Sequence, residues 1–287
     1  MTRRFFIAAL CIVAMLWPGS AEAGETNDFF AMDTIARGGP NAVVPMLKEL
    51  GYSGLGGAAG DVAMPAALER AGLRFFNAYA GVSFDAGQPA LTDVMRRNLE
   101  ALRGHDAALW LTIPKVTRDG KAFANSSPDG DATVVAALRE LADFARPLGV
   151  RIALYPHAGT WLERVEDAIR VAEKADRPSV GVTFNLCHWL KVEGSERDPG
   201  PVLKAAGARL MFVTINGADT GDTRQMGWDR LIQPLGSGSY DVGAFLAKVR
   251  EVRYTGPVGF QGFGIKGDAR EVLRRTIAAW WTIQPGL

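Results

Sequence analysis

The fold is decided by the stretch Val180-Gly181-Val182-Thr183-Phe184-Asn185-Leu186-Cys187-His188, in which an apolar run ends in a polar cluster. β-branched and aromatic residues in such a run indicate a strand of a parallel sheet that is buried on both faces. If strands of this kind close into a barrel, the polar clusters meet at one mouth, where such folds keep their chemistry. Three further runs end in the same way, in Tyr155-Pro156-His157, Asn216-Gly217-Ala218-Asp219 and Gln261-Gly262-Phe263.

Strand and helix patterns alternate along the whole chain. Their number and order predict an α/β fold, a (β/α)8 TIM barrel in a single domain, because no linker interrupts them. An open doubly wound sheet is the main alternative, which the count of eight strands disfavours. The expected strands are Phe29–Ala36, Tyr52–Leu55, Leu73–Ala80, Ala108–Ile113, Val150–Tyr155, Val180–Phe184, Leu210–Ile215 and Val258–Gln261. The expected helices are Asn41–Leu50, Val62–Ala71, Thr92–Arg103, Thr133–Arg146, Trp161–Lys174, Pro201–Ala206, Val242–Val252 and Ala269–Trp281.

The first residues have the pattern of a secretory signal peptide. Arg3-Arg4 precedes an apolar run from Phe5 to Trp17, and Ala21-Glu22-Ala23 fits a small-x-small cleavage site. We therefore expect residues 1–23 to be a signal peptide, residues 24–287 to form the barrel, and the mature protein to be periplasmic or secreted. Thr2–Ile7 also resembles a twin-arginine export signal, and general secretion is the alternative.

Charge and composition exclude some partners. Removal of residues 1–23 takes away two basic side chains and one acidic one, which lowers the formal net charge from +1 to zero. A neutral chain without a basic stripe argues against nucleic acid as a partner. No later run is long enough to span a membrane, so we expect no membrane partner in the mature form. Cys187 is the single cysteine beyond the signal, which leaves no intramolecular disulfide.

A glycine-rich segment formally matches a dinucleotide-binding motif. Gly54-Leu55-Gly56-Gly57-Ala58-Ala59 satisfies G-x-G-x-x-A. The strand before it is short, and no acidic residue ends the next strand to bind a ribose. We therefore expect these glycines to form a flexible second loop at the rim of the barrel.

The last four strand ends resemble those of the xylose isomerase-like superfamily, in its sugar phosphate isomerase/epimerase branch. The family patterns E-x-H, D-x-x-H, H-x-x-D and E-G align with the four clusters quoted above. Gly236-Ser237-Gly238-Ser239-Tyr240-Asp241 is similar to the family's G-x-G-x-x-D segment. The resemblance implies a xylose isomerase-like TIM barrel, and it implies one divalent metal held by a Glu, an Asp, a His and a Glu.

This chain departs from the family at all four metal positions. Tyr155, Asn185, Asn216 and Gln261 replace the Glu, the Asp, the His and the second Glu. Hard divalent cations bind where carboxylates offset their charge, and amide oxygens are weak substitutes. The cofactor is left open on these grounds, because a divalent metal would suit the family but its ligand set is missing.

The retained companions indicate a remodelled site that binds a polyol. His157, His188 and Asp219 remain beside the substituted positions. Amides and a phenol supply paired donors and acceptors that match sugar hydroxyls. His157 and His188 are the candidate general base and acid, because an imidazole titrates near neutral pH. The candidate substrate-binding residues are Tyr155, Asn185, Asn216, Asp219, Gln261, Lys266 and Asp33. Asp33 with His157 and His188 could instead form a rebuilt metal site.

Each candidate also has a structural explanation. The histidines could satisfy loop carbonyls, the asparagines could shape turns, and Gln261 could be a buried hydrogen-bonding residue. Asp33 could cap the following segment, and Lys266 could be a solvated loop charge.

The resemblance favours an exported sugar isomerase or epimerase that acts on a carbohydrate by isomerisation, epimerisation or β-elimination through an enediol-type intermediate. A non-catalytic carbohydrate-binding barrel is the alternative, and a metal-dependent hydrolase of the related endonuclease type is a third. The expected partner is a small sugar or glycoside. The sequence gives no indication of the oligomeric state.

Overall fold

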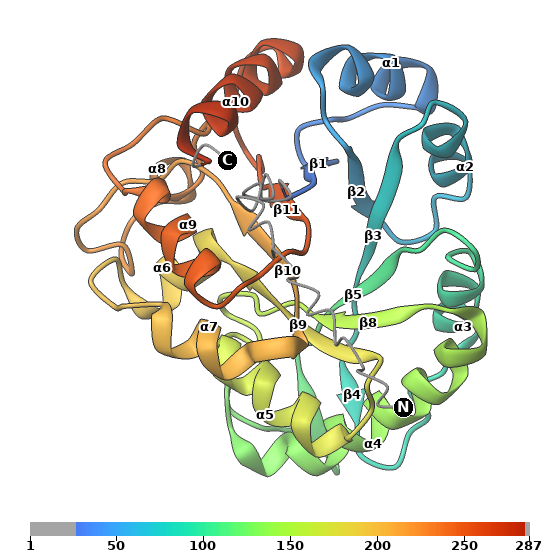
Figure 1. Ribbon diagram of the computed structural model, residues 1–287. Helices are drawn as coiled ribbons and strands as arrows, with labels where there is room; N and C mark the ends of the chain where they lie inside the picture. Colours follow the sequence, from blue (N-terminus) through green and yellow to red (C-terminus); the bar gives the residue numbers. More distant parts are fainter. Residues whose placement is uncertain (1–26, 285–287) are drawn as a thin grey trace, which may run out of the picture.

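Eight parallel strands close into a barrel with helices around it (Figure 1). The computed structural model describes residues 27–284. The barrel strands are β1 (Phe29–Met32), β2 (Gly54–Ala58), β3 (Arg74–Gly81), β5 (Ala108–Thr112), β8 (Arg151–Leu154), β9 (Val180–Asn185), β10 (Leu210–Ile215) and β11 (Val258–Phe260). Their closed order is β1-β11-β10-β9-β8-β5-β3-β2, which confirms the predicted TIM barrel.

Within residues 27–284, eight helices cover the outside of the barrel, and two more lie in the loops at its carboxyl end. The outer helices are α1 (Pro40–Leu50), α2 (Ala63–Arg70), α3 (Asp93–Glu100), α4 (Asp131–Ala145), α5 (Val165–Ala175), α7 (Gly200–Ala206), α9 (Val242–Glu251) and α10 (Ala269–Ile283). The loop helices are α6 (Leu186–Glu193) and α8 (Trp228–Leu231), which sequence periodicity did not predict. Short 3-10 turns occupy Pro128–Gly130, Arg146–Leu148 and Gly207–Arg209.

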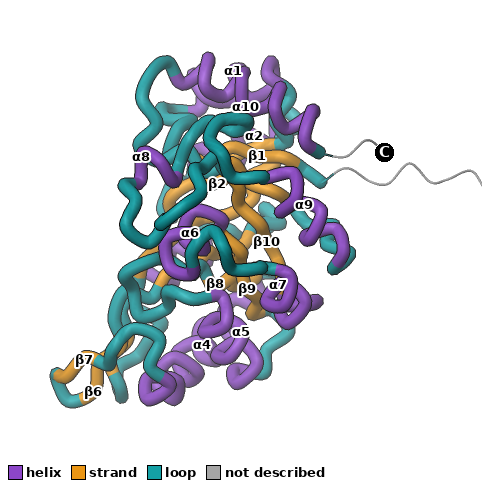
Figure 2. Tube along the Cα trace, turned by 90° about the vertical axis from the view of Figure 1, so that its left-hand side faces the viewer, coloured by secondary structure: helices purple, strands orange, loops and turns teal. Residues whose placement is uncertain are grey.

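A small second sheet also lies outside the barrel. It consists of β4 (Phe84–Asp85), β6 (Val116–Arg118) and β7 (Lys121–Ala122), in the order β4-β6-β7. The β6–β7 hairpin and α8 both project toward the left in Figure 2. The carboxyl-end loops therefore build a rim that rises beyond the barrel.

Two strands differ by more than one residue from those expected. The first strand ends at Met32 rather than Ala36, because the backbone N–H groups of Ile35 and Ala36 turn back to the Met32 carbonyl, at 3.2 Å each. The second strand is Gly54–Ala58 and not Tyr52–Leu55, so the expected flexible glycine loop is wrong. A Cβ at Gly54 would lie 1.9 Å from the Arg74 carbonyl oxygen. The glycines are needed because β2 lies tightly against β3.

Aromatic rings fill the interior of the barrel. Phe30 stacks on Phe76 with ring centroids 4.6 Å apart, and it meets Trp110 and Phe212 edge-on at 6.2 and 6.4 Å. Trp110 also stacks on Tyr155 at 5.2 Å. These rings come from β1, β3, β5 and β10 and from the end of β8, so their contacts cross the barrel. We call Phe30, Phe76, Trp110, Tyr155 and Phe212 the aromatic plug.

The aromatic plug depends on a glycine in the neighbouring strand. A Cβ at Gly259 would lie only 2.5 Å from Cζ of Phe30, far inside van der Waals contact. Phe30 is fully buried, so its ring has no solvent-facing position to move to.

We expect Gly259→Ala to lower the free energy of unfolding by about 1–3 kcal/mol, because overpacking forces the Phe30 ring from its place. Urea denaturation measures this change. Phe30→Leu in the same chain should recover part of the loss, so that the double variant loses less than the two single variants together. Strictly additive losses would show that the two positions do not compete for space.

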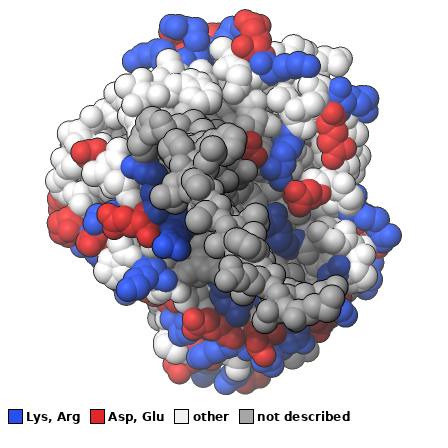
Figure 3. Space-filling model, viewed as in Figure 1, with Lys and Arg blue, Asp and Glu red and all other residues white. Residues whose placement is uncertain are grey.

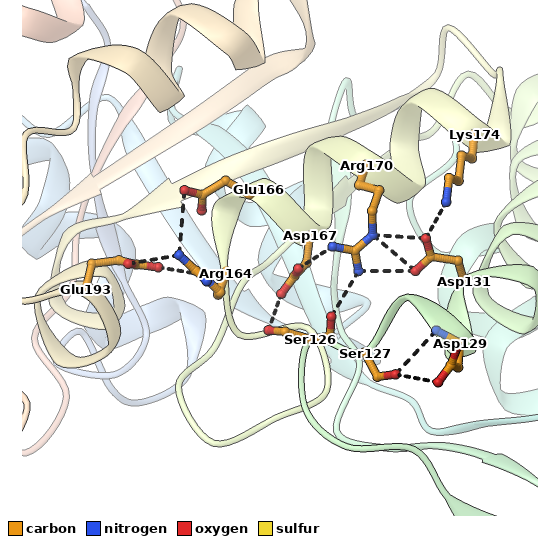
Figure 4. Close-up of polar contacts among 10 residues, drawn as sticks. All are labelled: Ser126, Ser127, Asp129, Asp131, Arg164, Glu166, Asp167, Arg170, Lys174 and Glu193. Atoms are coloured by element: carbon orange, nitrogen blue, oxygen red, sulfur yellow. Dashed lines mark hydrogen bonds and ion pairs between the residues drawn. The ribbon is translucent and has the colours of Figure 1, made fainter.

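An ion-pair cluster joins α4 to α5 (Figure 4). The Arg170 guanidinium donates to Asp131 at 2.9 Å and to Asp167 at 2.5 Å. Both carboxylate side chains are nearly buried, with 5% and 4% of their surface exposed. Lys174 also contacts Asp131 at 2.6 Å. Because buried carboxylates need a cation, Arg170 is the residue on which this interface depends.

Arg170→Met should lower the free energy of unfolding by about 3–5 kcal/mol, since it leaves two buried carboxylates short of their partner. Arg274→Met is the matched control. Arg274 pairs with Glu271, and both side chains are more than half exposed, so its loss should cost no more than about 1 kcal/mol. Equal losses in the two variants, measured by urea denaturation, would contradict this account.

The surface of the described chain carries charges of both signs. On the face shown in Figure 3, acidic and basic side chains are interspersed. Between residues 27 and 284, none of the helices has both the length and the apolar character to cross a bilayer. The predicted signal peptide, residues 1–23, lies outside the described residues.

Candidate active site

A cavity of about 560 Å³ lies at the carboxyl end of the barrel. Its size falls in the range typical of small-molecule sites. Tyr155 belongs to both the aromatic plug and the cavity lining, and Phe263 contributes an exposed aromatic ring, 55% accessible. Apart from two histidines, no residue that lines this cavity in the described chain is acidic or basic. The polar lining residues are Thr34, Tyr79, Thr112, Tyr155, His157, His188 and Gln261.

His157 and His188 form a pair in the wall of this cavity. Their ring centroids lie 4.0 Å apart, with the planes tilted by 41°. His157 follows β8, and His188 lies in the first turn of α6, not in the loop expected there. Because α6 begins directly after Asn185 at the end of β9, its first turn stays at the mouth of the barrel. The structure therefore brings together the two residues that the sequence proposed as acid and base.

A hydrogen bond defines the proton position on His157. Its Nδ1 lies 3.0 Å from the carbonyl oxygen of Ala158, which can only accept. Nδ1 therefore carries the proton, and in the neutral ring Nε2 keeps its lone pair. Burial lowers the pKa of His157 below its ordinary value, so the neutral, basic form is favoured near neutral pH.

His188 is more deeply buried than His157. Burial lowers its pKa well below 6.5, and the nearby His157 lowers it further. Its ring meets Tyr155 edge-on at 5.6 Å and Trp228 edge-on at 5.4 Å. Its Nδ1 is buried and has no hydrogen-bond partner among residues 27–284. The pair is thus uncharged and enclosed by aromatic rings.

A hydrogen-bond chain fixes the polar floor of the cavity. Gln261 Oε1 accepts from Thr34 Oγ1 at 2.8 Å and from the Phe263 backbone N–H at 3.1 Å. Gln261 Nε2 donates to the Tyr155 hydroxyl at 3.3 Å. These bonds set the orientation of the amide. Because the Tyr155 oxygen accepts from Gln261, its own O–H proton remains available to a ligand.

The side chains of Asn185 and Asn216 form hydrogen bonds within the protein and do not line the cavity. Asn185 donates to the Pro156 carbonyl at 3.3 Å and to Thr183 Oγ1 at 2.9 Å, and it accepts from Thr214 at 3.0 Å. Asn216 donates to the Gly217 and Leu231 carbonyls at 2.9 and 2.6 Å. Both therefore hold strands and loops together.

Two more sequence candidates lie away from the cavity. Asp219 accepts from Arg230 at 2.8 Å, and this bond holds the pKa of the carboxyl below its usual range. Lys266 is exposed and does not line the cavity. The structure does not bring either side chain to the histidine pair.

Asp33 lies beside the cavity rather than in its lining. It lines a neighbouring hollow of about 260 Å³. Its Oδ1 accepts from the Tyr79 hydroxyl at 3.0 Å, and its Oδ2 accepts from the Ala58 backbone N–H at 2.9 Å. Burial raises the pKa of Asp33, although these two bonds oppose the shift. Asp33 therefore reaches the cavity only through Tyr79.

Sequence reasoning missed four polar or aromatic lining residues, namely Thr34, Tyr79, Thr112 and Trp228. Thr34, Tyr79 and Thr112 lie within two residues of the ends of β1, β3 and β5, so the strand-end rule could have found them. Trp228 begins a four-residue helix inside a long loop, and no periodic signal marks it.

The residues at the four family metal positions do not fit a divalent cation. The oxygens of Asn185 and Gln261 already accept protein hydrogen bonds, and of these side-chain amide oxygens only Asn216 Oδ1 is buried without a partner in residues 27–284. One neutral oxygen does not offset a divalent charge. In the described chain, no group of three His, Cys, Asp or Glu residues could hold a metal ion, so the alternative site of Asp33, His157 and His188 is not assembled.

The fold and the position of the cavity agree with a match to a known family. Residues 46–282 match the family described as xylose isomerase-like TIM barrel. The chain belongs to this family, which confirms the resemblance seen in the four strand-end clusters.

The chain is also similar to a curated relative and to two solved structures. The L-ribulose 3-epimerase of Methylomonas sp. (strain DH-1) is 26% identical over 164 residues, which cover 56% of this chain. This chain spans about half, 52%, of that relative.

The structure is similar to D-allulose 3-epimerase from Methylomonas sp., with a TM-score of 0.68, 17% identity, and coverage of 90% of this chain and 98% of that one. It is also similar to 3-keto-D-glucoside 4-epimerase from E. coli, with a TM-score of 0.67, 20% identity, and coverage of 90% and 100%. At these identities the structural likeness shows the shared fold.

The buried histidine pair should make the protein less stable in acid. The unfolded state binds a proton on each histidine below about pH 6.5, while the folded state, with its lowered pKa values, does not. The free energy of unfolding should therefore fall as the pH falls below about 6.5, by up to about 1.4 kcal/mol per pH unit for each histidine.

The double variant His157→Gln/His188→Gln should lose this component, so its stability should change less between pH 7 and pH 5 than that of the wild type. Urea denaturation at several pH values measures it. His105→Gln, which removes the remaining histidine at the amino end of β5, controls for the loss of an imidazole. Parallel profiles for wild type and double variant would contradict the assignment.

Proposed function

We propose that this protein is a carbohydrate isomerase or epimerase that moves a proton beside the carbonyl of a sugar. The observation that carries the proposal is the neutral His157–His188 pair, 4.0 Å apart in the wall of a cavity of about 560 Å³. The family match supports it, as does the likeness to L-ribulose 3-epimerase, which acts on a sugar.

His157 is the general base in this proposal. Its Nε2 takes a proton from the carbon next to the sugar carbonyl, and the electron pair of the broken C–H bond forms an enediolate. The Tyr155 hydroxyl, held by Gln261, donates a hydrogen bond to the developing oxyanion. The proton of the neighbouring sugar hydroxyl moves to this oxyanion, the C–O bond it leaves becomes the new carbonyl, and His157 returns its proton to the former carbonyl carbon, which completes an isomerisation.

Burial makes the pair suited to this step. A neutral imidazole is a base, whereas an imidazolium is not, and the lowered pKa keeps both rings neutral near neutral pH. The proposed proton transfer therefore does not need a carboxylate as its base. His188 packs against His157 and keeps that ring in the cavity wall.

A non-catalytic sugar-binding barrel is the second candidate, and one observation favours it. The residues that replace the family's metal ligands mostly serve internal hydrogen bonds, as Asn185 does between β8, β9 and β10. The protein would then keep the shape of the cavity but would not convert the bound sugar. Export to the periplasm or the medium, proposed from residues 1–23, applies to both candidates.

His157→Ala should reduce kcat by about 10²–10⁴-fold on a converted sugar, because it removes the base. Conversion in D2O, followed by NMR, measures turnover and the entry of deuterium at the carbon next to the carbonyl. His105→Ala, at the other end of the barrel, should leave both unchanged. Tight sugar binding by the wild type with no conversion and no deuterium entry would support the binding protein instead.

A further inference from the structure

Tyr79 and Asp33 form a pair between two hollows of the barrel mouth. Tyr79 lines the histidine cavity, and Asp33 lines the neighbouring hollow of about 260 Å³. The Tyr79 O–H points to Asp33 Oδ1 at 3.0 Å, while Asp33 Oδ2 is occupied by the Ala58 backbone N–H at 2.9 Å. Both carboxylate oxygens therefore act as acceptors.

This hydrogen bond decides what Tyr79 can offer a ligand. A phenol has one donor hydrogen, and here that hydrogen is directed to the carboxylate. Toward the cavity, the phenol oxygen keeps only lone pairs. A bound molecule must therefore bring a donor, such as a hydroxyl, to this point of the wall.

The pair joins two separate parts of the barrel wall. In the closed order of strands, β1 lies four places from β8, on the opposite side of the ring, and β3 lies two places from both. Asp33 follows β1, Tyr79 lies on β3, and His157 follows β8. Tyr79 therefore meets a ligand about a quarter of the ring away from the proposed base, and Asp33 supports it from the far side.

Charge around the cavity points in the same direction. Among the residues of the described chain that line it, there is no lysine or arginine to pair with a phosphate or carboxylate. The Asp33 carboxylate lies only one hydrogen bond behind the Tyr79 oxygen and repels anions, while Arg37, which lines the neighbouring hollow with Asp33, offsets part of its charge. The uncharged lining and the Asp33 carboxylate both disfavour an anionic ligand.

We propose that the Asp33–Tyr79 pair is a recognition element that selects an uncharged carbohydrate through a free hydroxyl and rejects sugar phosphates and sugar acids. Tyr79 is the ligand-binding residue, and Asp33 is a positioning residue that acts through it. This inference rests on the proposed function, because it names the substrate class of the same cavity.

The fixed backbone bond makes Asp33→Asn an informative variant. The Ala58 N–H still needs an acceptor, so the amide oxygen takes the place of Oδ2 and the NH2 group faces Tyr79. The Tyr79 oxygen then accepts from that NH2 group, and its own O–H turns toward the cavity. The variant therefore converts an acceptor into a donor and removes the negative charge.

The test is isothermal titration calorimetry at fixed ionic strength with neutral and anionic probes. The neutral probes are D-allulose, D-fructose and sucrose, and the anionic probes are D-fructose 6-phosphate and D-galacturonate. The wild type should bind a neutral probe more tightly than either anionic one. Tyr79→Phe should weaken that neutral binding about 10-fold, the effect of one lost hydrogen bond.

Asp33→Asn should weaken neutral binding and strengthen anionic binding, a reversal that simple loss of structure does not produce. Tyr240→Phe is the matched control, because Tyr240 is a partly buried tyrosine that does not line the cavity, and it should bind as the wild type does. If Asp33→Asn does not fold, as judged by circular dichroism, Tyr79→Phe alone decides.

The outcomes separate this inference from the proposed function. If the wild type converts a neutral sugar, His157→Ala abolishes conversion, and Tyr79→Phe binds normally, the role of the pair is overturned and the function stands. If the wild type prefers an anionic probe and converts it through His157, the substrate class is overturned and the function again stands. If no probe binds, both are overturned.

Discussion

The aromatic plug is the constraint on which the rest of the structure depends. Phe30 occupies the centre of the barrel because Gly259 leaves room for its ring, and the other rings of the plug stack around it. Tyr155 is the last ring of this stack and the first side chain of the cavity. Packing inside the barrel therefore sets the depth of the cavity, and Tyr155 marks the boundary between the packed interior and the polar lining.

The replacement of the family's metal-binding residues also has a physical explanation, which lies in the hydrogen bonds at the end of the barrel. Asn185 bonds to Pro156, Thr183 and Thr214, which lie at the ends or within three adjacent strands. An aspartate there would carry a buried charge, which costs several kcal/mol unless it is paired. An amide has both donors and acceptors, so it satisfies the strand ends without a cation. The amide therefore keeps this end of the barrel uncharged and satisfies its hydrogen bonds at the same time.

Much of the fold and part of the site could be predicted from sequence, because parallel strands impose their order on the polar residues that follow them. His157, His188, Tyr155 and Gln261 meet in the cavity for this reason. Asn185 does not, because side chains alternate along a strand and a sequence does not say which face of the barrel end each one takes.

The remaining differences come from the loops. Helix α6 starts without a connecting residue after β9, a junction that has no turn signal in the sequence. Lys266 and Asp219 lie in loops whose path depends on tertiary contacts. The strand-end rule can place Tyr79 at the cavity, but its pairing with Asp33 cannot be predicted, because Asp33 is distant in the chain and adjacent only after folding.

The direct junction between β9 and α6 has a consequence for how this barrel can change over evolution. Helix α6, which carries His188, follows β9 with no loop between them, so this junction has no loop segment in which insertions and deletions could accumulate. His157 instead begins a longer loop, and its backbone N–H is held by the Leu162 carbonyl at 2.9 Å. New specificities can therefore arise by remodelling the β8–α5 loop around His157, while His188 keeps its position relative to the barrel.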